Sequence, residues 1–225
     1  MTRKKSLIDD GFCSYLVEGA TFDGIFEIPH IDAPKEIKLP QRIVPFTKVN
    51  KGNPSKDAIG FFEFDPTFAD IIKAPQNHLI LLKQYYCVLS LDCSLYRDMP
   101  FAGQIANTYK NRAICYYLRK HGIYTLPLIR WGDERSYTRI QHSECLAFQG
   151  VEKNSIYAVS SYGCIKSKED KYHFRAGLDA LMEELEPKII LAYGSNNPKI
   201  YAAYERYVKI IHYPDWTSIQ KGCDK

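Results

Sequence analysis

Residues 87–112 read CVLSLDCSLYRDMPFAGQIANTYKNR, and the remainder of the chain can be understood from this stretch outward. Its apolar start, residues 87–91, predicts a short strand that ends abruptly at Asp92. Arg97 and Asp98 follow in a charged loop, and a helical pattern begins directly after them. A strand that delivers an acid into a charged loop predicts one wall of a functional site.

The helix predicted at residues 104–121 carries an uncharged polar stripe. Residues three and four positions apart share one face of a helix. The side chains at this spacing are Gln104, Asn107, Thr108 and Asn111. Gly122, just past the predicted end, is typical of a helix C-terminus. We expect this polar face to line the same site as Asp92.

Short apolar runs alternate with helical patterns along the rest of the chain. Strands are predicted at residues 41–46, 58–64, 87–91, 123–129, 156–160, 189–193 and 208–212, and helical segments at 66–85 (interrupted at Pro75), 104–121, 171–186 and 200–207. Strands separated by helices of this length predict βαβ units and a mostly parallel sheet. No glycine-rich dinucleotide fingerprint follows the first strand. The pattern favours an α/β fold built as a small or incomplete TIM-like (βα) barrel over a doubly wound open sheet.

The domain organisation predicted from this pattern is simple. Residues 1–40 are punctuated by prolines and predict an irregular N-terminal arm. Residues 41–216 are expected to form a single α/β domain, and residues 217–225 a C-terminal tail. No internal repeat is visible at the level of residue identity.

Composition limits the function classes. A net charge of +4, spread over 225 residues, permits a phosphate-bearing partner without requiring one. The seven cysteines are scattered and never form C-x-x-C, which favours free thiols in a reducing cytoplasm and no structural zinc. Neither a signal-peptide pattern nor an apolar segment of membrane-spanning length occurs. We therefore expect a cytoplasmic protein with no membrane partner; its oligomeric state is not predicted.

Polar and charged side chains gather where the predicted strands end. They are Glu63 and Asp65 after the second strand, Asp92 after the third, Arg130, Trp131, Asp133 and Arg135 after the fourth, Ser160, Ser161 and Gly163 after the fifth, and Tyr193 and Gly194 after the sixth. Ligands of parallel α/β folds bind at this edge, because the loops there converge. Structural roles fit too, such as an ion pair between Asp92 and Arg97 or plain glycine turns.

The acids in this set are candidate metal ligands. Glu63, Asp65 and Asp92 supply oxygen ligands for Mg²⁺ if their strands are neighbours. The histidines are dispersed and none shows H-x-x-x-H spacing, so no metal site or cofactor is otherwise expected. Cys93 is not expected to be a nucleophile, because the adjacent Asp92 carboxylate raises a thiol pKa.

Several of these segments together resemble a known family. The blocks are LDCSLYRDMP, Q-I-x-N-T-Y-x-N-R, PLIRWGDERSY, AVSSYGC and L-x-P-K-I-I-L-A-Y-G, and they occur in order over roughly residues 40 to 195. They are similar to the blocks of domain of unknown function 4417, a family of bacteria, phages and other mobile elements. The family commonly has an aromatic residue where this chain has Cys93, while Asp92 and Ser94 are kept. The resemblance implies a setting and a residue set, but no reaction.

Two functions are favoured at this point, and a third, that of a structural or self-assembling protein, predicts an exposed apolar patch. In the first, the protein of a phage or mobile element acts on a nucleotide or nucleic acid at the mouth of the barrel, as a phosphodiester hydrolase or by N-glycosidic chemistry. In the second, it is a non-catalytic nucleic-acid-binding or inhibitory factor that uses the same cleft. The candidate catalytic residues are Asp92, Asp98, Glu63 and Asp65. The candidate substrate-binding residues are Arg97, Gln104, Asn107, Tyr109, Asn111, Arg112, Arg130, Trp131, Asp133, Arg135, Ser160, Ser161, Gly163, Tyr193 and Gly194.

Overall fold

The computed structural model describes residues 13–140 and 142–222. Residues 1–12 of the predicted arm and residues 223–225 of the predicted tail lie outside the described range.

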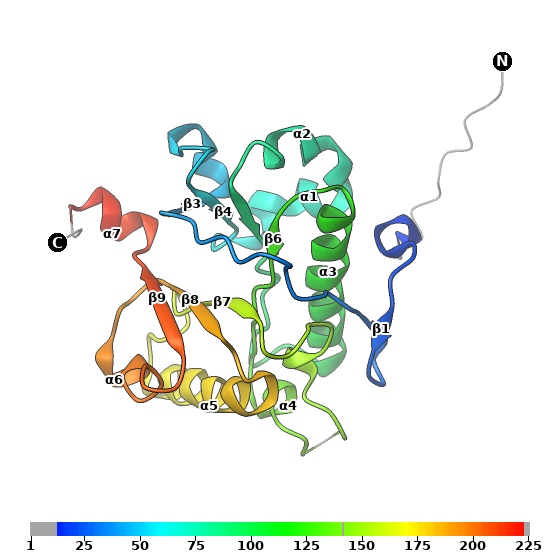
Figure 1. Cartoon of the computed structure of the whole chain (residues 1–225). Coiled ribbons are helices and arrows are strands. Elements are labelled where there is room, and N and C mark those ends of the chain that lie inside the picture. Colours follow the sequence, from blue (N-terminus) through cyan, green and yellow to red (C-terminus); the bar gives the residue numbers. More distant parts are fainter. Residues whose placement is uncertain (1–12, 141, 223–225) are drawn as a thin grey trace.

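Seven strands in the described chain form two parallel sheets (Figure 1). The order is β3-β4-β5-β6 in one sheet and β7-β8-β9 in the other, so neighbours in the sheet are also neighbours in the chain. Their bounds are Ile43–Pro45 (β3), Ala58–Gly60 (β4), Cys87–Leu89 (β5), Thr125–Leu126 (β6), Ile156–Ser160 (β7), Ile189–Tyr193 (β8) and Lys209–Tyr213 (β9). All pairings within these sheets are parallel, which confirms the predicted α/β class.

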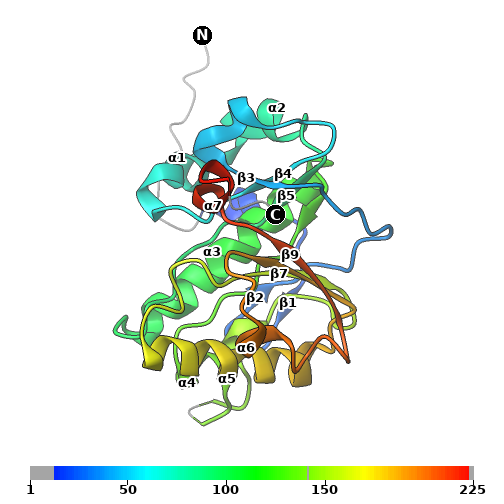
Figure 2. The same ribbon diagram turned by 90° about the vertical axis from the view of Figure 1, so that its left-hand side faces the viewer.

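The two sheets meet at an isolated parallel bridge between Leu128 and Ala158. One buried cluster draws members from all seven strands or the residues next to them, among them Ile43, Ala58, Leu89, Leu126, Ile156, Leu191 and Tyr213. Past β9, helix α7 (Trp216–Gln220) returns beside β3 in both views (Figures 1 and 2). Within the described residues no strand pairing joins β9 to β3. The predicted TIM-like barrel is therefore not confirmed as a closed barrel.

Helical segments connect successive strands. The α-helices before α7 are Ala69–Lys73 (α1), Leu79–Leu82 (α2), Phe101–Lys120 (α3), Glu134–Tyr137 (α4), Lys168–Leu185 (α5) and Pro198–Tyr201 (α6), and the 3₁₀ turns between strands are Phe46–Lys51 (η2), Asp65–Phe68 (η3), Pro75–His78 (η4) and Leu146–Phe148 (η5). Pro75 interrupts the predicted helix at 66–85, as its missing N–H requires. Of the helix predicted at 200–207, only Ile200 and Tyr201 are helical, at the end of α6, and turns replace residues 202–207.

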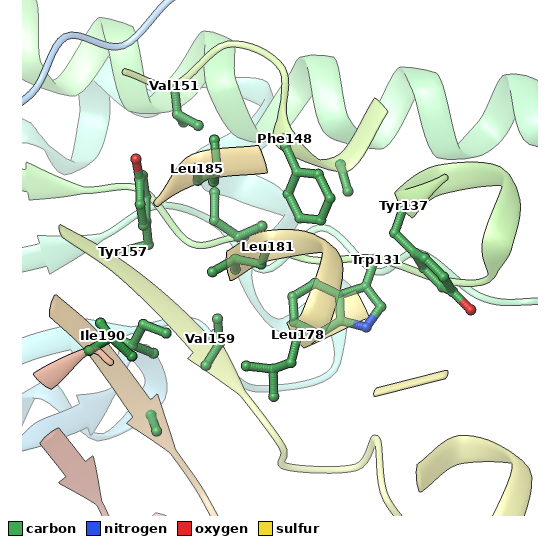
Figure 3. Close-up of a cluster of buried hydrophobic side chains, with 14 of the residues drawn as sticks. Trp131, Tyr137, Phe148, Val151, Tyr157, Val159, Leu178, Leu181, Leu185 and Ile190 are labelled. Carbon is green, nitrogen blue, oxygen red and sulfur yellow. The ribbon is translucent and has the colours of Figure 1, made fainter. Parts of the chain in front are cut away.

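Helix α5 shows how local sequence fixes an element. Ser167 and Asp170 form a capping box, in which each side chain accepts the other residue's backbone N–H at 2.9 Å. Leu178, Leu181 and Leu185 are buried on one face, which lies against the β7-β8-β9 sheet. Figure 3 shows this packing, with Val159 and Ile190 among the partners.

Trp131 packs directly on the backbone of α5. A Cβ atom at Gly177 would lie 2.2 Å from the indole nitrogen of Trp131, so only glycine permits this close approach. The indole N–H donates to the carbonyl of His173, one turn earlier in the helix, over 3.1 Å. The residue that follows Arg130 is thus fixed by α5, and this positions the loop after β6.

The N-terminal arm is more ordered than predicted. After the 3₁₀ turn η1 (Ser14–Val17), strands β1 (Phe22–Asp23) and β2 (Ile28–Pro29) form a small antiparallel hairpin. Ile28 is fully buried where β2 packs against α3, and Ile31 bridges to Val151. The hairpin lies on the far side of α3 from β8 and β9 (Figure 1).

Within the described ranges, no helix is both long enough and apolar enough to span a membrane.

Candidate functional site

A cavity of about 680 Å³, which we call the strand-end cavity, lies where β4, β5, β6 and β7 end. Its wall comes from the segments directly after those strands and from the start of α5. The residues that line it are Phe62, Glu63, Phe64, Asp65, Thr67, Asp92, Ser94, Leu95, Tyr96, Arg97, Ile129, Arg130, Trp131, Gly132, Ser160, Tyr162, Gly163, Cys164, Lys166, Asp170, His173 and Phe174. Strands β8 and β9 contribute none of these residues, so the cavity occupies one side of the strand ends.

Asp92 and Arg130 form a bidentate ion pair in this cavity. Arg130 Nε donates to one carboxylate oxygen over 2.7 Å, and Arg130 Nη2 donates to the other. The side chains are only 4% and 16% exposed. Burial raises the pKa of the Asp92 carboxyl, and the charge and hydrogen bonds of Arg130 oppose that rise. Asp92 in turn raises the pKa of Arg130 despite its burial, so the guanidinium stays charged.

Cys164 completes this cluster from the loop after β7. Its sulfur lies 2.6 Å from Nη1 of Arg130. The three side chains of Asp92, Arg130 and Cys164 thus come from the ends of β5, β6 and β7. The cluster was predicted only in part, since the sequence indicated Asp92 and Arg130 as site residues but not their pairing.

Glu63 and Asp65, from the end of β4, are also in the wall. Asp65 accepts hydrogen bonds from Ser94 N at 3.1 Å and Ser94 Oγ at 2.7 Å. Glu63 accepts hydrogen bonds from the backbone N–H of Thr47, at 3.0 Å, and from its hydroxyl. Each carboxylate is therefore held by a different partner.

These acids do not converge as a metal site. Among the described residues, the one group of three potential ligands whose atoms all lie within 4.8 Å of one another is elsewhere, at His30, Asp32 and Glu152. Glu63, Asp65 and Asp92 are therefore neighbours across the wall, not a ready Mg²⁺ ligand set. Asp98 is exposed in the turn before α3 and is absent from the cavity wall.

Aromatic side chains stand around the cavity on three different segments. Phe64, Tyr96 and Tyr162 are 71%, 51% and 46% exposed, although each lines the cavity. Such exposure of large rings leaves apolar faces available to a flat ligand. They follow β4, β5 and β7, so the rings approach the opening from several directions.

Charged groups from α5 and its approach complete the wall. Arg97 pairs with Glu169 at 2.7 Å and Asp170 at 2.9 Å, which joins the loop after β5 to the first turn of α5. Lys166 precedes that turn and lines the cavity. His173 Nδ1 lies 2.8 Å from the hydroxyl of Tyr137, which orients the imidazole.

The polar face of α3 has a different role from the predicted one. Asn111 donates to the carbonyls of Leu91 and Leu128, and its side-chain oxygen accepts from Ser90 at 3.1 Å. Asn107 donates to Ser94 O over 2.7 Å. Gln104 is fully buried and donates to the Tyr96 carbonyl at 3.3 Å. None of these three side chains lines the cavity.

Arg112, a predicted substrate-binding residue, is also buried and does not line the cavity. It is 1% exposed and donates to the carbonyls of Leu128, Ala147 and Gln149, each at 3.0 Å, and to Asn111 Oδ1 at 2.6 Å. Burial lowers its pKa to about 10, which still leaves it charged at neutral pH. Tyr109 packs on a hydrophobic core cluster, also outside the cavity wall.

Some of the charged residues that follow β6 line the cavity, and others support the segments around it. Asp133 caps α4 by accepting the Arg135 N–H at 3.1 Å, and it pairs with the Arg135 guanidinium at 2.6 Å. Arg135 also donates to the carbonyls of Arg97 and Met99, at 2.7 and 3.0 Å. Asp133 and Arg135 thus hold the loop after β5 in place and do not line the cavity.

The strand ends at β7 and β8 also differ from expectation. Ser160 and Gly163 line the cavity, whereas Ser161 does not. Ser161 Oγ accepts the backbone N–H of Ser195 at 3.0 Å, and a Cβ at Gly194 would lie 2.7 Å from that oxygen. Gly194, a candidate substrate-binding residue, therefore lies in a close-packed connection.

Tyr193 is part of the packing between the strands. Its ring stacks on Phe62, with centroids 4.2 Å apart, and its hydroxyl accepts the Trp216 N–H at 3.0 Å. It does not line the cavity, although Phe62 does.

Sequence reasoning missed several wall residues, namely Phe62, Tyr96, Tyr162, Cys164, Lys166, Asp170 and His173. Tyr96, Tyr162 and Cys164 lie within the strand-end segments that had been singled out, so position could have indicated them. Lys166, Asp170 and His173 enter through the approach to α5 and its first turns. Only the way this helix packs on the sheet brings them to the cavity.

The chain is similar to known sequences but not to a solved structure. A family model described as "Domain of unknown function (DUF4417)" matches residues 20–214. The Gene 1 protein of Mycobacterium phage D29 is 33% identical over 140 residues, which is 62% of this chain and 49% of that protein. The Gene 1 protein of Mycobacterium phage L5 is 33% identical over 137 residues, 61% of this chain and 57% of that protein. The chain thus spans about half the length of these relatives. No solved structure matches significantly.

Proposed function

The chain belongs to the family of domain of unknown function 4417, and from the geometry of its strand-end cavity we propose that it binds a nucleotide unit, free or within a nucleic-acid strand, and cleaves or exchanges its N-glycosidic bond. The observation that carries the proposal is the combination of exposed aromatic rings with a buried carboxylate–guanidinium pair in one cavity. Bases stack on aromatic rings regardless of sequence. The family is described as one of unknown function, so membership in it does not indicate an activity.

The rim supports recognition of a flat, charged ligand. Tyr162 and Phe64 offer ring faces, and Lys166 with Arg97 supplies positive charge near them. Arg97 is already paired with Glu169 and Asp170, so phosphate would have to compete for it, whereas Lys166 approaches from the adjoining loop. A volume of about 680 Å³ lies within the ordinary range for small-ligand sites, about 300–1,000 Å³.

The carboxylates favour N-glycosidic over phosphodiester chemistry. Metal-assisted phosphodiester hydrolysis needs oxygen ligands that converge on an ion, and Glu63, Asp65 and Asp92 do not form such a group. N-glycosidic cleavage needs one carboxylate beside the anomeric carbon, which attacks it or stabilises its positive charge as the base leaves. Asp92, held in one orientation by Arg130, fits this role, with Asp65 as the nearby acid or base.

We further infer that the two sheets form one incomplete (βα) barrel within a single domain. Seven parallel strands follow one another in order, the Leu128–Ala158 bridge joins the sheets, and a shared cluster fills the space between them. Tyr213 Oη also donates to the Pro40 carbonyl at 2.8 Å, beside the start of β3. In this arrangement the strand-end cavity is the mouth of the barrel.

A second candidate is binding without turnover, as in an inhibitory factor. It is favoured by the full engagement of Asp92, since Arg130 holds both of its carboxylate oxygens. A carboxylate that is permanently paired has little basicity or nucleophilicity to offer.

Binding is tested with Tyr162→Ala. Loss of one stacking ring should weaken affinity for labelled single-stranded DNA and RNA and for nucleoside monophosphates by about 1–3 kcal/mol, measured by fluorescence polarisation and calorimetry. Tyr207→Ala is the matched control, because Tyr207 is 70% exposed but lies outside the cavity. Equal affinities in both variants and the parent protein would exclude the cavity as the binding site.

Turnover is tested with Asp92→Asn and Asp65→Asn, by chromatographic detection of released base. We expect Asp92→Asn to abolish base release while binding persists. Because removal of one partner of a buried pair costs about 3–5 kcal/mol, folding is checked by circular dichroism, and Asp65→Asn serves as the milder variant. Ligand binding by the parent protein without base release would select the non-catalytic alternative.

A further inference from the structure

A cluster of potential metal ligands lies between the β1–β2 hairpin and the segment after η5. The ligand atoms of His30, Asp32 and Glu152 all lie within 4.8 Å of one another. His30 Nε2 is 3.3 Å from Glu152 Oε2 and 3.7 Å from Asp32 Oδ1. Ligands bonded to Zn²⁺ at about 2.0–2.2 Å in a tetrahedron are separated by roughly 3.3–3.6 Å. The observed spacing is therefore close to that of an assembled site.

His30 is oriented as a metal ligand is. Its Nδ1 lies 2.6 Å from Asp23 Oδ2, in a hydrogen bond that places a proton on Nδ1. Its Nε2 faces the carboxylates of Asp32 and Glu152 and lies within hydrogen-bond distance of Glu152. A metal ion bound there takes the place of a proton on Nε2 and meets three electron-pair donors at one point. A carboxylate behind the histidine is the usual support of a metal-bound imidazole.

The cluster opens onto a cavity of its own. This second cavity, about 400 Å³, is lined by Asp23, His30 and Glu152 and shares no residue with the strand-end cavity. Gln149 also lines it and is 8% exposed, and its side-chain oxygen has no hydrogen-bond partner within the described residues. A buried acceptor without a partner is costly, and a bound water molecule would supply the missing donor.

From this arrangement we propose that His30, Asp32 and Glu152 bind a divalent transition-metal ion of the Zn²⁺ class. One imidazole nitrogen and two carboxylate oxygens suit Zn²⁺, whereas Mg²⁺ prefers oxygen ligands and water. Three protein ligands leave a fourth position for water. Because His30 follows β2 and Glu152 follows the Ile31–Val151 bridge, the ion fastens the N-terminal hairpin to the body of the domain.

The test is direct titration of the full chain, stripped with a chelator, with ZnSO₄ by calorimetry and with CoCl₂ by visible absorption. We expect one ion per chain, tetrahedral Co²⁺ bands, and a higher Tm with Zn²⁺. Asp32→Asn and Glu152→Gln should each abolish stoichiometric binding; Asp32 is 90% exposed, so its substitution leaves folding intact. Asp23→Asn should weaken binding about 10- to 100-fold through the orientation of His30.

The chain contains a matched control pair. His212 and Glu205 lie 3.2 Å apart, with exposures of 20% and 50%, against 19% and 49% for His30 and Glu152. Among the described residues, that pair belongs to no three-residue ligand group, so His212→Ala and Glu205→Gln should bind Zn²⁺ as the parent protein does. Absence of stoichiometric binding, or binding that survives Asp32→Asn and Glu152→Gln, would overturn the proposal and leave a plain ion pair.

Discussion

The loop at residues 92–97 and the polar face of helix α3 lie side by side, yet the polar side chains of the two regions have different roles. In the loop, Asp92 and Arg97 face the strand-end cavity. On α3, Asn111 and Arg112 are buried and donate to backbone carbonyls. Polar residues at adjacent positions in the fold thus line the cavity in the loop, whereas on α3 they form the scaffold that supports the cavity.

The reason lies in the shortness of the strands. β5 and β6 pair over few residues, so the carbonyls of Leu91 and Leu128 extend beyond the ladder. Buried carbonyls need a donor, and the amide of Asn111 and the guanidinium of Arg112 supply several. Arg112 is suited to this because its five N–H groups reach several acceptors at once. The scaffold therefore holds the strand ends from which the cavity loops emerge.

Arg112→Met should have the largest effect, on stability. It leaves the carbonyls of Ala147 and Gln149 buried without their donor, and the carbonyl of Leu128 with only the longer bond from Asn111. At about 1–3 kcal/mol for each unsatisfied group, with incomplete additivity, the free energy of unfolding should fall by about 4 kcal/mol. Urea denaturation followed by circular dichroism measures this.

The control is Arg139→Met. Arg139 is 56% exposed and pairs with Glu184 at 2.6 Å, so its loss should cost far less stability than that of Arg112. Similar losses for the two variants would mean that Arg112 does not hold the scaffold together.

Two glycine-to-alanine variants compare the helices themselves. At Gly177 in α5, a Cβ would lie 2.2 Å from the Trp131 indole nitrogen, so the ring must move and lose its bond to His173 O. Overpacking costs about 1–3 kcal/mol, offset by about 1 kcal/mol of helix propensity, so Gly177→Ala should destabilise by up to about 2 kcal/mol.

Gly103→Ala is the counterpart in α3. There the new methyl group meets only the flexible side chain of Met99, at 2.8 Å. We expect it to be neutral or slightly stabilising. Tryptophan emission and urea midpoints distinguish the outcomes, and a stabilised Gly177→Ala variant would show that Trp131 is not fixed by α5.

The sequence was informative about strands and their ends. The predicted bounds at 156–160 and 189–193 match β7 and β8, because those strands are continuous apolar runs buried on both faces. β4 is shorter than predicted, ending at Gly60, since Glu63 N turns back to the carbonyl of Phe61. The alternation of strands and helices was sufficient to predict parallel α/β topology.

The roles of polar side chains were harder to predict. A helical face with amides at three- and four-residue spacing looks the same whether it meets a ligand or unpaired carbonyls. For Asn111 and Arg112, the deciding fact is that β5 and β6 end early, which depends on tertiary packing. Lys166 and His173 are absent from the predicted site for a related reason, since only the position of α5 and its preceding loop brings them to the cavity.

Asp133 connects the two regions and provides the smallest, pH-dependent test. Burial would raise the pKa of its carboxyl, but hydrogen bonds and charge from Arg135, with a further hydrogen bond from Gln104 on α3, hold the pKa below its usual value. An acid with a depressed pKa in the folded state stabilises the protein above its unfolded pKa, about 3.9. That contribution is lost as pH falls through the folded-state pKa.

Asp133→Asn keeps an N-cap residue of equal quality and removes the ion pair to Arg135. The variant should be less stable by about 0.5–1 kcal/mol at pH 7, and its difference from the parent protein should shrink as the pH falls below about 4. Urea midpoints at several pH values measure the difference, with the exposed Asp98→Asn as the control. A difference that stays constant with pH would mean that the charge on Asp133 does not stabilise the loop after β5. Asp133 would then contribute only through its hydrogen bond as the N-cap of α4.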